Sequence, residues 1–414
     1  MTHSPSPAAT LQVPFFRPDL RQAEIDEVVE TLRSGWLTTG PRVHRFEQEF
    51  AAAVGAGQAL ALNSCTAALH LAVAALGLKA GQVVLVPTMT MAATAEVLRY
   101  QGAVPLLVDC DPVTLNLDLA DAERKIADLK AGRLPMEPGT DPQPVGVIPV
   151  HVGGLMIDLA ELNRFAERHR LWLVEDAAHA FPAAWRGDAT QPWRRCGEGT
   201  SAVTCFSFYA NKTITTGEGG MATSDRPELI EQMRVLSLHG LSSDAWGRFT
   251  ATGSWDYRII APGFKYNLTD VAAAIGLHQL ARAEAMRQQR QLLAERYLAA
   301  LADVEELELP PVPANRIHSW HLFVVKLRLE RLGVDRNAFL QELRSRGVGY
   351  SVHWRPLHLH PFYQETLGWR SELLPAASAV WQRLISLPLF PTMTEEEQGH
   401  VIATLRELCR RHRR

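Results

Sequence analysis

The sequence predicts an α/β protein built on a mostly parallel sheet, with a second and smaller α/β domain toward its C-terminal end. Between residues 58 and 223, short apolar β-rich runs alternate with segments of helical periodicity, which is typical of parallel strands covered by helices on both faces. The chain has 414 residues, of which 47% are hydrophobic, and this is enough for two domains with sizeable cores. A long helical pattern at about 271–301 leads into further β-like and helical runs, which indicate the second domain.

The expected elements follow in order along the chain. A loose tail at 1–12 precedes helices at 21–32 and 43–53, and Gly35 ends the first of them. We expect strands at 59–62, 83–86, 104–108, 145–150, 171–174, 202–208 and 220–223, and a surface insertion rich in Gly and Pro at 130–144. Beyond the long helix, 321–327 is β-like, and 336–346 and 395–412 are helical. We therefore place the large domain at 13–285 and the small domain at 286–414.

Net charge and cysteine usage exclude several classes of protein. The formal net charge of −3 provides no basic surface for nucleic acid. No apolar run is long enough to cross a membrane, and the first residues lack the pattern of a secretory signal. The five cysteines include no C-x-x-C pair, which favours a reducing compartment over a disulfide framework or a zinc site. We expect a cytoplasmic protein with neither a nucleic-acid nor a membrane partner.

Lys212 lies in a Thr- and Gly-rich link, directly after the apolar run 202–208. On position alone it is a solvated surface charge, because lysine is seldom buried without a partner. An amine held near apolar walls has a lowered pKa, however, and can then form a Schiff base with a carbonyl. The neighbouring motifs decide between these two interpretations.

Two other segments carry polar residues at the predicted carboxyl ends of strands, where open parallel sheets bind ligands. Ser64, Cys65 and Thr66 lie between the first strand and an Ala-rich helix that runs to about residue 76, and the start of such a helix can bind phosphate. A simple N-cap is the alternative for this site. Asp176 ends an apolar strand, where a carboxylate is costly unless it meets a cation, and His179 follows it. The alternatives there are a capping aspartate and a core histidine.

Three further patterns are interpreted as structural. Asp109 and Asp111 form a turn in which capping explains the carboxylates better than metal binding does. The histidines at 353, 358 and 360 have no standard metal-ligand spacing. The G-x-G-x-x-A match at 197–202 precedes a β-like run and not a helix, so it does not indicate a dinucleotide site or a reductase.

Six motifs in order resemble those of the DegT/DnrJ/StrS group of pyridoxal-phosphate-dependent sugar aminotransferases, which have fold type I. The lysine segment FSFYANKTITTGEGG at 206–220 is the longest of them. The others are WLTTGP at 36–41, NSCTAALH at 63–70, EDAAH at 175–179, PGFKYNLTD at 262–270 and VHWRPLHLHPFY at 352–363. The resemblance therefore covers most of the chain.

The resemblance implies a role for each matching residue. Lys212 is the Schiff-base lysine and the general acid and base. Asp176 pairs with the protonated ring nitrogen, which makes the ring an electron sink, and His179 lies beside the ring. The implied phosphate ligands are Ser64, Cys65, Thr66 and Ser207, together with Asn267 from the second subunit of a homodimer with shared sites.

Substrate contacts are implied for Thr38, Lys265 and His353. The family normally places an aromatic residue against the cofactor ring where this chain has Met91, which on its own would be interpreted as a core residue. This departure bears on the shape of the sugar pocket, for which Trp246 and Arg248 are further candidates.

The implied function is transfer of an amino group from L-glutamate to a nucleotide-linked keto-sugar, in a ping-pong reaction with pyridoxal phosphate and pyridoxamine phosphate as the two cofactor forms. The implied pathways make a surface polysaccharide, a glycan or an antibiotic sugar. Dehydratases of the group have histidine in place of Lys212, so the lysine argues against that branch. Two alternatives stay open, an aminocyclitol aminotransferase and a non-catalytic regulatory or binding protein on the same scaffold.

Overall fold

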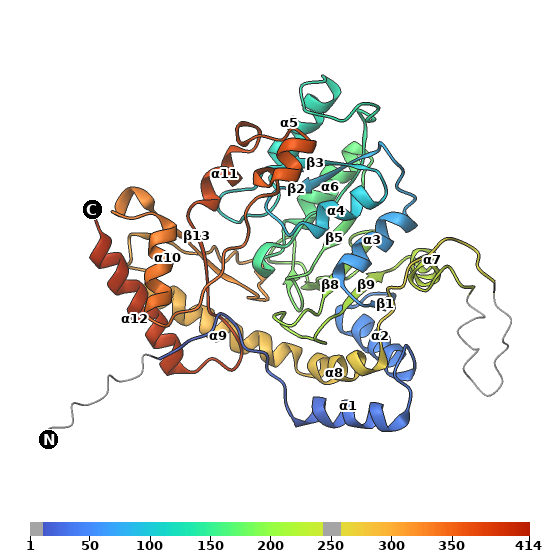
Figure 1. Cartoon of the computed structure of the whole chain (residues 1–414), viewed down its shortest axis with the longest axis horizontal. Helices are drawn as coiled ribbons and strands as arrows, with labels where there is room; N and C mark the ends of the chain where they lie inside the picture. The colour runs from blue at the N-terminus through green and yellow to red at the C-terminus, as the bar shows by residue number, and fades with distance from the viewer. Residues whose placement is uncertain (1–10, 243–257) are drawn as a thin grey trace.

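The computed structural model describes residues 11–242 and 258–414. Two of the proposed sugar-pocket candidates, Trp246 and Arg248, and most of the expected N-terminal tail lie outside the described residues. The described chain forms a large sheet with helices around it, and a smaller α/β part lies beside this sheet (Figure 1). The predicted α/β class is confirmed.

The central sheet has seven strands in the order β1-β9-β8-β5-β4-β2-β3. The strands are β1 (Gln58–Leu62), β2 (Val83–Pro87), β3 (Val104–Val108), β4 (Pro144–Val147), β5 (Trp172–Asp176), β8 (Val203–Ser207) and β9 (Gly220–Ser224). Each contains or overlaps a predicted strand. The pairs β2–β3, β2–β4, β4–β5 and β5–β8 are parallel, whereas β9 pairs antiparallel with both β1 and β8. The sheet is therefore mostly parallel. All of its strands except β9 run in one direction, so their six carboxyl ends lie at the same edge of the sheet.

Helices from the N-terminal two thirds of the chain cover this sheet directly or pack on one another beside it. They are α1 (Gln22–Ser34), α2 (Pro41–Val54), α3 (Cys65–Ala75), α4 (Ala93–Tyr100), α5 (Leu119–Lys130), α6 (Leu159–His169), α7 (Pro227–Ser237) and α8 (Asp270–Ala281). The Ala-rich α3 is almost wholly buried and contacts β5, β8 and β9, while α4 and α7 flank it. The small side chain of alanine allows the helix to approach the sheet closely. The start of α3 then lies at the edge of the sheet where the parallel strands end.

The C-terminal part is organised around the sheet β10-β12-β13. Its elements are α9 (Ala283–Leu301), β10 (Leu307–Glu308), β12 (Phe323–Leu327), α10 (Arg336–Ser345), α11 (Pro375–Trp381), β13 (Leu384–Leu387) and α12 (Glu395–His412). Among the described residues, this part also has short helical turns at Leu329–Arg331, Leu357–Leu359, Phe362–Thr366 and Ser371–Leu373, and one more, at Val152–Gly154, lies beside the central sheet. A capping box of Thr394 and Glu397 fixes the start of α12, where the sequence predicts it.

The predicted single helix at 271–301 is two helices. Arg282 is the non-helical residue between α8 and α9, and its guanidinium donates to Asp19 Oδ2 at 2.7 Å and to Glu24 Oε1 at 2.5 Å. These partners lie more than 250 residues away in sequence. The break therefore depends on tertiary contacts that helical periodicity cannot reveal.

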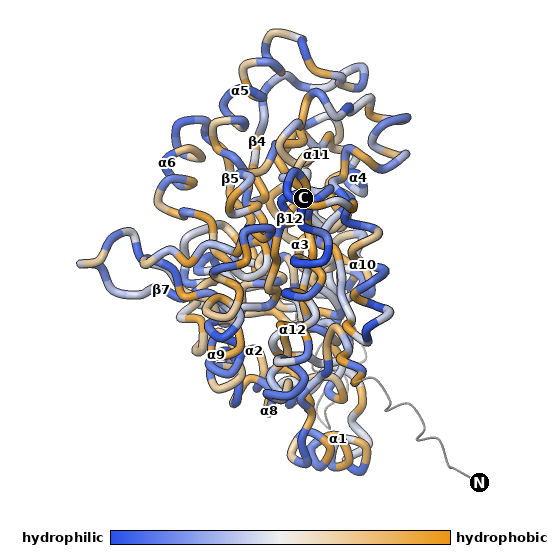
Figure 2. Tube along the Cα trace, turned by 90° about the vertical axis from the view of Figure 1, so that its left-hand side faces the viewer, coloured by the Kyte–Doolittle hydropathy of each residue, from blue (hydrophilic) through white to orange (hydrophobic). Residues whose placement is uncertain are grey.

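Buried apolar side chains form one large cluster around the central sheet and a second cluster between α9, α12 and β12, and a third, smaller cluster includes Met89, Val150 and Leu384. Figure 2 shows hydrophobic colour concentrated along the inner strands and hydrophilic colour on the outer turns. A third sheet consists of two-residue strands, namely β11 (Arg316–Ile317), β6 (Ala184–Trp185) and β7 (Arg194–Arg195). Its hairpin, formed by β6 and β7, projects from the body in the same view. Among the described residues, no helix combines the length and the apolar character that crossing a bilayer requires.

Two of the structural interpretations can be checked directly. The G-x-G-x-x-A segment leads into strand β8 and not into a helix, so it is not a dinucleotide loop. Asp109 accepts from the backbone N–H groups of Cys110, Ala376 and Ala377, and Asp111 accepts from that of Thr114. Both carboxylates serve as caps, as predicted.

Candidate active site

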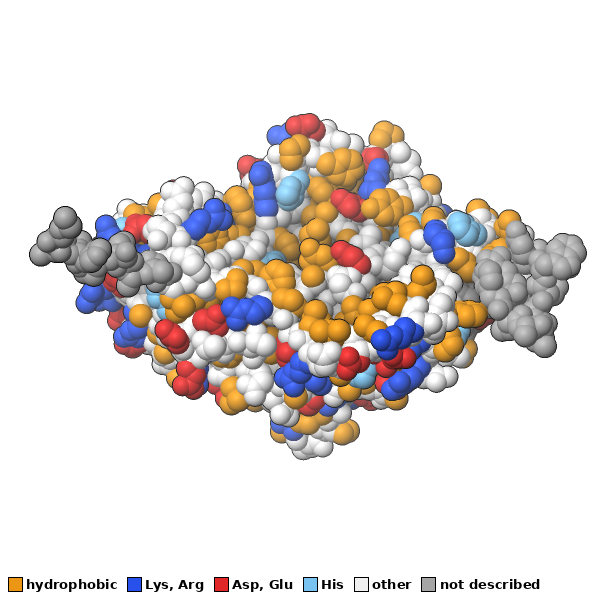
Figure 3. Space-filling view, turned by 60° about the horizontal axis from the view of Figure 1, so that its bottom comes forward, with side chains coloured by type: hydrophobic (Ala, Val, Ile, Leu, Met, Phe, Trp, Pro, Cys, Tyr) orange, Lys and Arg blue, Asp and Glu red, His pale blue; other side chains and the backbone are white. Residues whose placement is uncertain are grey.

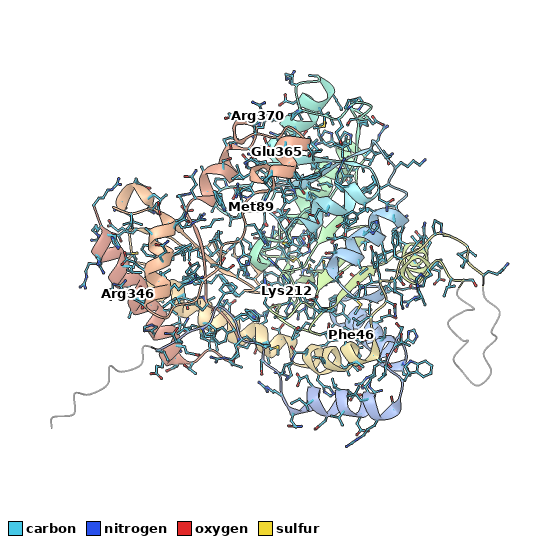
Figure 4. The ribbon with its side chains drawn as sticks, viewed as in Figure 1. Phe46, Met89, Lys212, Arg346, Glu365 and Arg370 are labelled. Carbon is cyan, nitrogen blue, oxygen red and sulfur yellow. The ribbon has the colours of Figure 1, made fainter. Side chains whose placement is uncertain are left out.

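A cavity of about 330 Å³ lies at the edge of the central sheet where the parallel strands end. Lys212 is in its wall and near the middle of the molecule (Figure 4). Nine predicted site residues line the cavity: Ser64, Cys65, Thr66, Met91, Asp176, His179, Ser207, Lys212 and His353. Segments that are far apart in sequence are thus brought together at the expected edge.

Lys212 is held by a loop whose two ends are fixed in the sheet. Phe208 N–H donates to Gly219 O at 2.9 Å at the base of the loop, and Lys212 N–H donates to Tyr209 O at 2.9 Å within it. Loss of hydration inside the protein lowers the pKa of the Lys212 amine to about 8, although the nearby Asp176 charge acts in the opposite direction. The interpretation as a solvated surface charge is therefore wrong, and about a tenth of this amine is neutral and nucleophilic at pH 7, far more than for an ordinary lysine.

Asp176 is a buried carboxylate at the end of β5, and none of the described residues forms an ion pair with it. Its Oδ2 accepts from Thr94 Oγ1 at 2.8 Å and its Oδ1 from Ala178 N–H at 3.1 Å. Burial raises the pKa of this carboxyl, while these two hydrogen bonds and the charge of Lys212 lower it. A cation in the cavity would supply the missing partner.

The start of α3 forms another wall of the cavity. Ser64 Oγ accepts from Ala67 N–H at 3.1 Å, so the N-cap interpretation holds for this side chain. Within the described chain, the backbone N–H groups of Cys65 and Thr66 have no acceptor, which leaves them available to an anion. A Cβ on Gly220 would lie 2.5 Å from the Cys65 nitrogen, so only glycine lets β9 pass this close. Ser207 completes this side of the cavity.

These features fit pyridoxal phosphate. The free amine of Lys212 matches its aldehyde, the unpaired Asp176 matches its ring nitrogen, and the unpaired N–H groups of α3 match its phosphate. The fit rests on the donor and acceptor groups of the cavity wall and on their placement along one sheet edge.

The far wall of the cavity consists of imidazole and indole rings. The His179 ring stacks on Trp354 with centroids 5.1 Å apart, and it lies 4.2 Å from the ring of His321. His353 Nδ1 lies 2.8 Å from Ser386 Oγ, and burial followed by the Lys212 charge lowers the pKa of His353 to about 4. Burial likewise holds the pKa of His179 well below its usual range. This wall is uncharged at neutral pH.

Three predicted residues lie outside this cavity. Thr38 is exposed, and its carbonyl accepts from Asp270 N–H at 3.1 Å. Lys265 Nζ donates to Asn267 Oδ1 at 2.5 Å, and Asn267 Nδ2 donates to Thr39 Oγ1 at 2.8 Å. Met91 is at the cavity mouth with 60% of its surface exposed, so the interpretation as a core residue is wrong.

Several residues of the cavity wall were missed in the sequence. They are Leu69, Thr90, Ala93, Val150, Ala178, Tyr209, Asn211, Glu218, Gly219, His321 and Trp354. Some of them lie within the quoted motifs, and Trp354 follows the predicted His353 directly. Thr94 lies behind the wall, where it donates a hydrogen bond to Asp176. Nothing in the sequence around Thr94 or His321, apart from a few neighbouring polar residues, indicates a place in the site.

His151, Glu175 and Cys196 form a buried group close enough to hold a metal ion. Its polar atoms already have partners, because His151 Nε2 lies 2.8 Å from Glu175 Oε2 and His151 Nδ1 accepts from Ile157 N–H at 3.3 Å. Thr200 Oγ1 donates to the other Glu175 oxygen at 2.9 Å. We therefore interpret the group as a hydrogen-bond network beneath Asp176.

His358 has a similar structural setting. It is buried, with one ring nitrogen 2.8 Å from Thr88 Oγ1 and the other 2.8 Å from Ser378 Oγ. Both nitrogens are occupied, as the structural interpretation of this histidine requires.

Comparisons with known proteins agree with the geometry. Residues 18–406 match the model of the DegT/DnrJ/EryC1/StrS aminotransferase family. The spore coat polysaccharide biosynthesis protein SpsC of Bacillus subtilis is 39% identical over 399 residues, which cover 96% of this chain and 97% of SpsC.

Solved structures give the same result. The putative sugar aminotransferase Spr1654 of Streptococcus pneumoniae, in its PMP form, superposes with a TM-score of 0.86 at 30% identity, over 97% of this chain and 98% of Spr1654. S. venezuelae DesV superposes with a TM-score of 0.82 at 30% identity, over 96% of this chain and 98% of DesV. Spr1654 has also been solved in a PLP form. This chain therefore has fold type I, and it belongs to the DegT/DnrJ/EryC1/StrS aminotransferase family as a pyridoxal-phosphate-dependent sugar aminotransferase.

Proposed function

We propose that the protein transfers the amino group of L-glutamate to a keto-sugar that is linked to a nucleotide. One observation carries the proposal: an amine with a pKa of about 8, an unpaired buried carboxylate and the unpaired N–H groups of a helix start face one cavity. When bound, pyridoxal phosphate supplies an aldehyde that condenses with amines and a ring that stabilises the electron pair of an adjacent carbon. The protein has to supply positioning and proton transfer.

Lys212 is the proposed proton carrier. Its amine takes a proton from the carbon that bears the amino group and returns it to the carbonyl carbon of the cofactor, and it does the reverse for the keto-sugar. Asp176 keeps the ring nitrogen protonated, and Thr94 orients the carboxylate for that bond. His179 is neutral and flat against Trp354, which makes it suited to lie beside the cofactor ring without competing for the Lys212 proton.

The phosphate side of the site is proposed to be completed by the start of α3, Ser207 and the second subunit of a homodimer. Asn267 lies outside the cavity of its own chain, which is consistent with a role in the partner's site. Exposed apolar side chains lie on and near α1, namely Leu20, Ile25, Leu32 and Leu37. Figure 3, which brings the α1 side of Figure 1 forward, shows hydrophobic side chains in several groups on this face. Covering them in a dimer would remove apolar area from water.

We propose that the sugar nucleotide is contacted by Thr38, Lys265 and His353. Met91 leaves the cavity mouth wider than an aromatic side chain would. We also propose that the large domain ends near residue 285 and the small domain follows it; residues from both sides of this boundary, such as Lys212 and His353, line the cavity. All five cysteines are free, which suits a reducing cytoplasm.

The test is the visible absorption spectrum of the protein with pyridoxal phosphate, recorded before and after addition of L-glutamate. We expect the band of the lysine-bound cofactor to fade as the pyridoxamine form accumulates. A panel of nucleotide-linked keto-sugars should then restore the band, whereas restoration by keto-cyclitols alone would identify an aminocyclitol aminotransferase. A band that no amino donor changes would identify a binding protein.

A further inference from the structure

A segment at the N-terminal end of the described chain lies behind the cavity wall. Residues 11–19, here called the N-terminal strap, form no helix and lead into α1 (Figure 1). The ring of Phe15 in this strap stacks on the ring of His353, with the ring centroids 5.7 Å apart and the ring planes at 28°. His353 lines the cavity and Phe15 does not, so Phe15 contacts the cavity wall from the outside.

Hydrogen bonds on both sides of Phe15 fix the strap to the C-terminal part of the chain. Gly349 N–H donates to Val13 O at 2.8 Å, and Val13 N–H donates to a second carbonyl of the same loop, also at 2.8 Å. A Cβ on Gly349 would lie 2.6 Å from the Phe15 nitrogen, so glycine at this position allows the strap to pass closely. Farther along, Arg17 Nη2 donates to Glu397 Oε1 at 2.8 Å. Phe15 lies midway between these two anchors.

The contacts of His353 leave one of its ring nitrogens open. Nδ1 lies 2.8 Å from the hydroxyl of Ser386, which is a fully buried residue of β13. Within the described chain, Nε2 has no hydrogen-bond partner, and it is not shielded from solvent, so it is accessible from the cavity that the ring lines. Stacking on Phe15 restricts the plane of the ring, and the contact with Ser386 restricts its rotation. Together they set the direction of Nε2.

We propose that Phe15 is a positioning residue of the active site, which holds the His353 ring so that Nε2 faces the substrate. The inference rests on the proposed function, in which His353 contacts the sugar nucleotide. Phe15 touches neither substrate nor cofactor, so it acts through His353 alone. Without the phenyl ring, one face of the imidazole would be open to water, and the ring could turn away from its productive orientation.

The first test follows the titration of His353 by NMR in cofactor-free protein labelled on histidine, where His353→Gln identifies the signal. Burial followed by the Lys212 charge lowers the pKa of His353 to about 4. The neighbouring His179 and His321 stay neutral, because burial holds the pKa of each well below its usual range. In Phe15→Ala water reaches the His353 ring, so its midpoint should rise toward the ordinary value of 6.5. Phe15→Tyr, which keeps the ring, should retain the low midpoint.

The second test is a double-mutant cycle with the cofactor-loaded enzyme. Phe15→Ala should raise KM for the keto-sugar about threefold to tenfold and change kcat less, and His353→Ala should raise KM at least as much. Because Phe15 acts through His353, adding Phe15→Ala to His353→Ala should have little further effect. The matched control is Phe16→Ala, since Phe16 is the next strap residue, is exposed and stacks on no ring in the described part of the chain. This control should leave KM unchanged.

Three results would overturn the inference: a His353 midpoint that stays near 4 in Phe15→Ala, effects of Phe15→Ala and His353→Ala on KM that simply add, or an equal rise of KM in Phe16→Ala. Circular dichroism establishes that each variant is folded. Failure of the proposed function is distinguishable, because wild type itself would then aminate no keto-sugar, whereas the NMR titration needs no substrate.

Discussion

Thr94 donates a hydrogen bond to Asp176 over 2.8 Å, although 82 residues separate them in sequence. Thr94 also lies 2.7 Å from Thr90 Oγ1, so its hydroxyl is fixed between two partners. Asp176 is proposed to pair with the ring nitrogen of the cofactor, and the Thr94 bond favours the ionised form that this pairing needs. This hydrogen bond connects helix α4, which carries Thr94, to the carboxylate at the end of β5.

Replacing Thr94 by Val should therefore weaken cofactor binding. The variant keeps the shape of the side chain but removes a donor to a buried carboxylate, so affinity for pyridoxal phosphate should fall by roughly tenfold to a hundredfold. Absorption titration of the cofactor-free protein measures this. Thr94→Ser, which retains the hydroxyl, should bind almost as tightly as wild type. Equal affinities for the Val variant and wild type would show that the bond is not needed.

Lys212→Ala should abolish turnover while the protein stays folded. We expect a loss of about a thousandfold or more, because both the covalent attachment of the cofactor and the proton transfer depend on this amine. Activity assays and circular dichroism are the measurements. Lys212→Arg, which keeps the charge without the nucleophile, should be equally inactive, while Lys79→Ala on the surface should be unaffected. Retained activity in Lys212→Ala would remove this residue from the mechanism.

Reaction of the cofactor-free protein with pyridoxal phosphate should depend on pH through Lys212. Only the neutral amine attacks the aldehyde, so the rate should rise about tenfold per pH unit well below the pKa of about 8 and level off above it. Stopped-flow absorption between pH 6 and 10 tests this. A rate that kept rising toward the ordinary lysine value of 10.5 would show an unshifted amine.

The same pKa shift predicts a change in stability. Between about 8 and 10.5 the unfolded chain binds a proton at Lys212 that the folded chain does not, so this group's contribution to the free energy of unfolding rises with pH in that window. Lys212→Met should abolish that part of the slope in denaturant titrations across the window. An unchanged slope would contradict the shift.

Asn267 and Lys212 should complement each other across subunits. Asn267→Ala and Lys212→Ala homodimers should both be poorly active, but a heterodimer of the two would contain one site with both native residues. Reassortment of equal amounts should restore about a quarter of wild-type activity. Mixing Lys212→Ala with Ser207→Ala, whose residues line the same cavity, is the control and should restore much less. No recovery in the first mixture would place Asn267 outside the partner's site.

Local sequence patterns predicted the strands well because each is a short apolar run between turn residues. The Lys212, Asp176 and α3 segments could be placed at one sheet edge because parallel strands share their carboxyl ends. The break at Arg282 and the bond from Thr94 to Asp176 could not be predicted, since both depend on partners distant in sequence. His321 was missed for the same reason, because no local pattern shows that the fold brings this segment to the cavity wall.

The loop that carries Lys212 begins and ends in hydrogen-bonded strands, with Ser207 paired to Gly220 and Phe208 N–H bonded to Gly219 O. Both strands are buried inner strands of the central sheet, so we expect their amide protons to exchange with solvent only when much of the protein unfolds. The loop that carries Lys212 is thus anchored at both ends to strands that should open rarely. If Lys212 is the proton carrier that we propose, its long side chain can move between cofactor and substrate while its Cα stays in place.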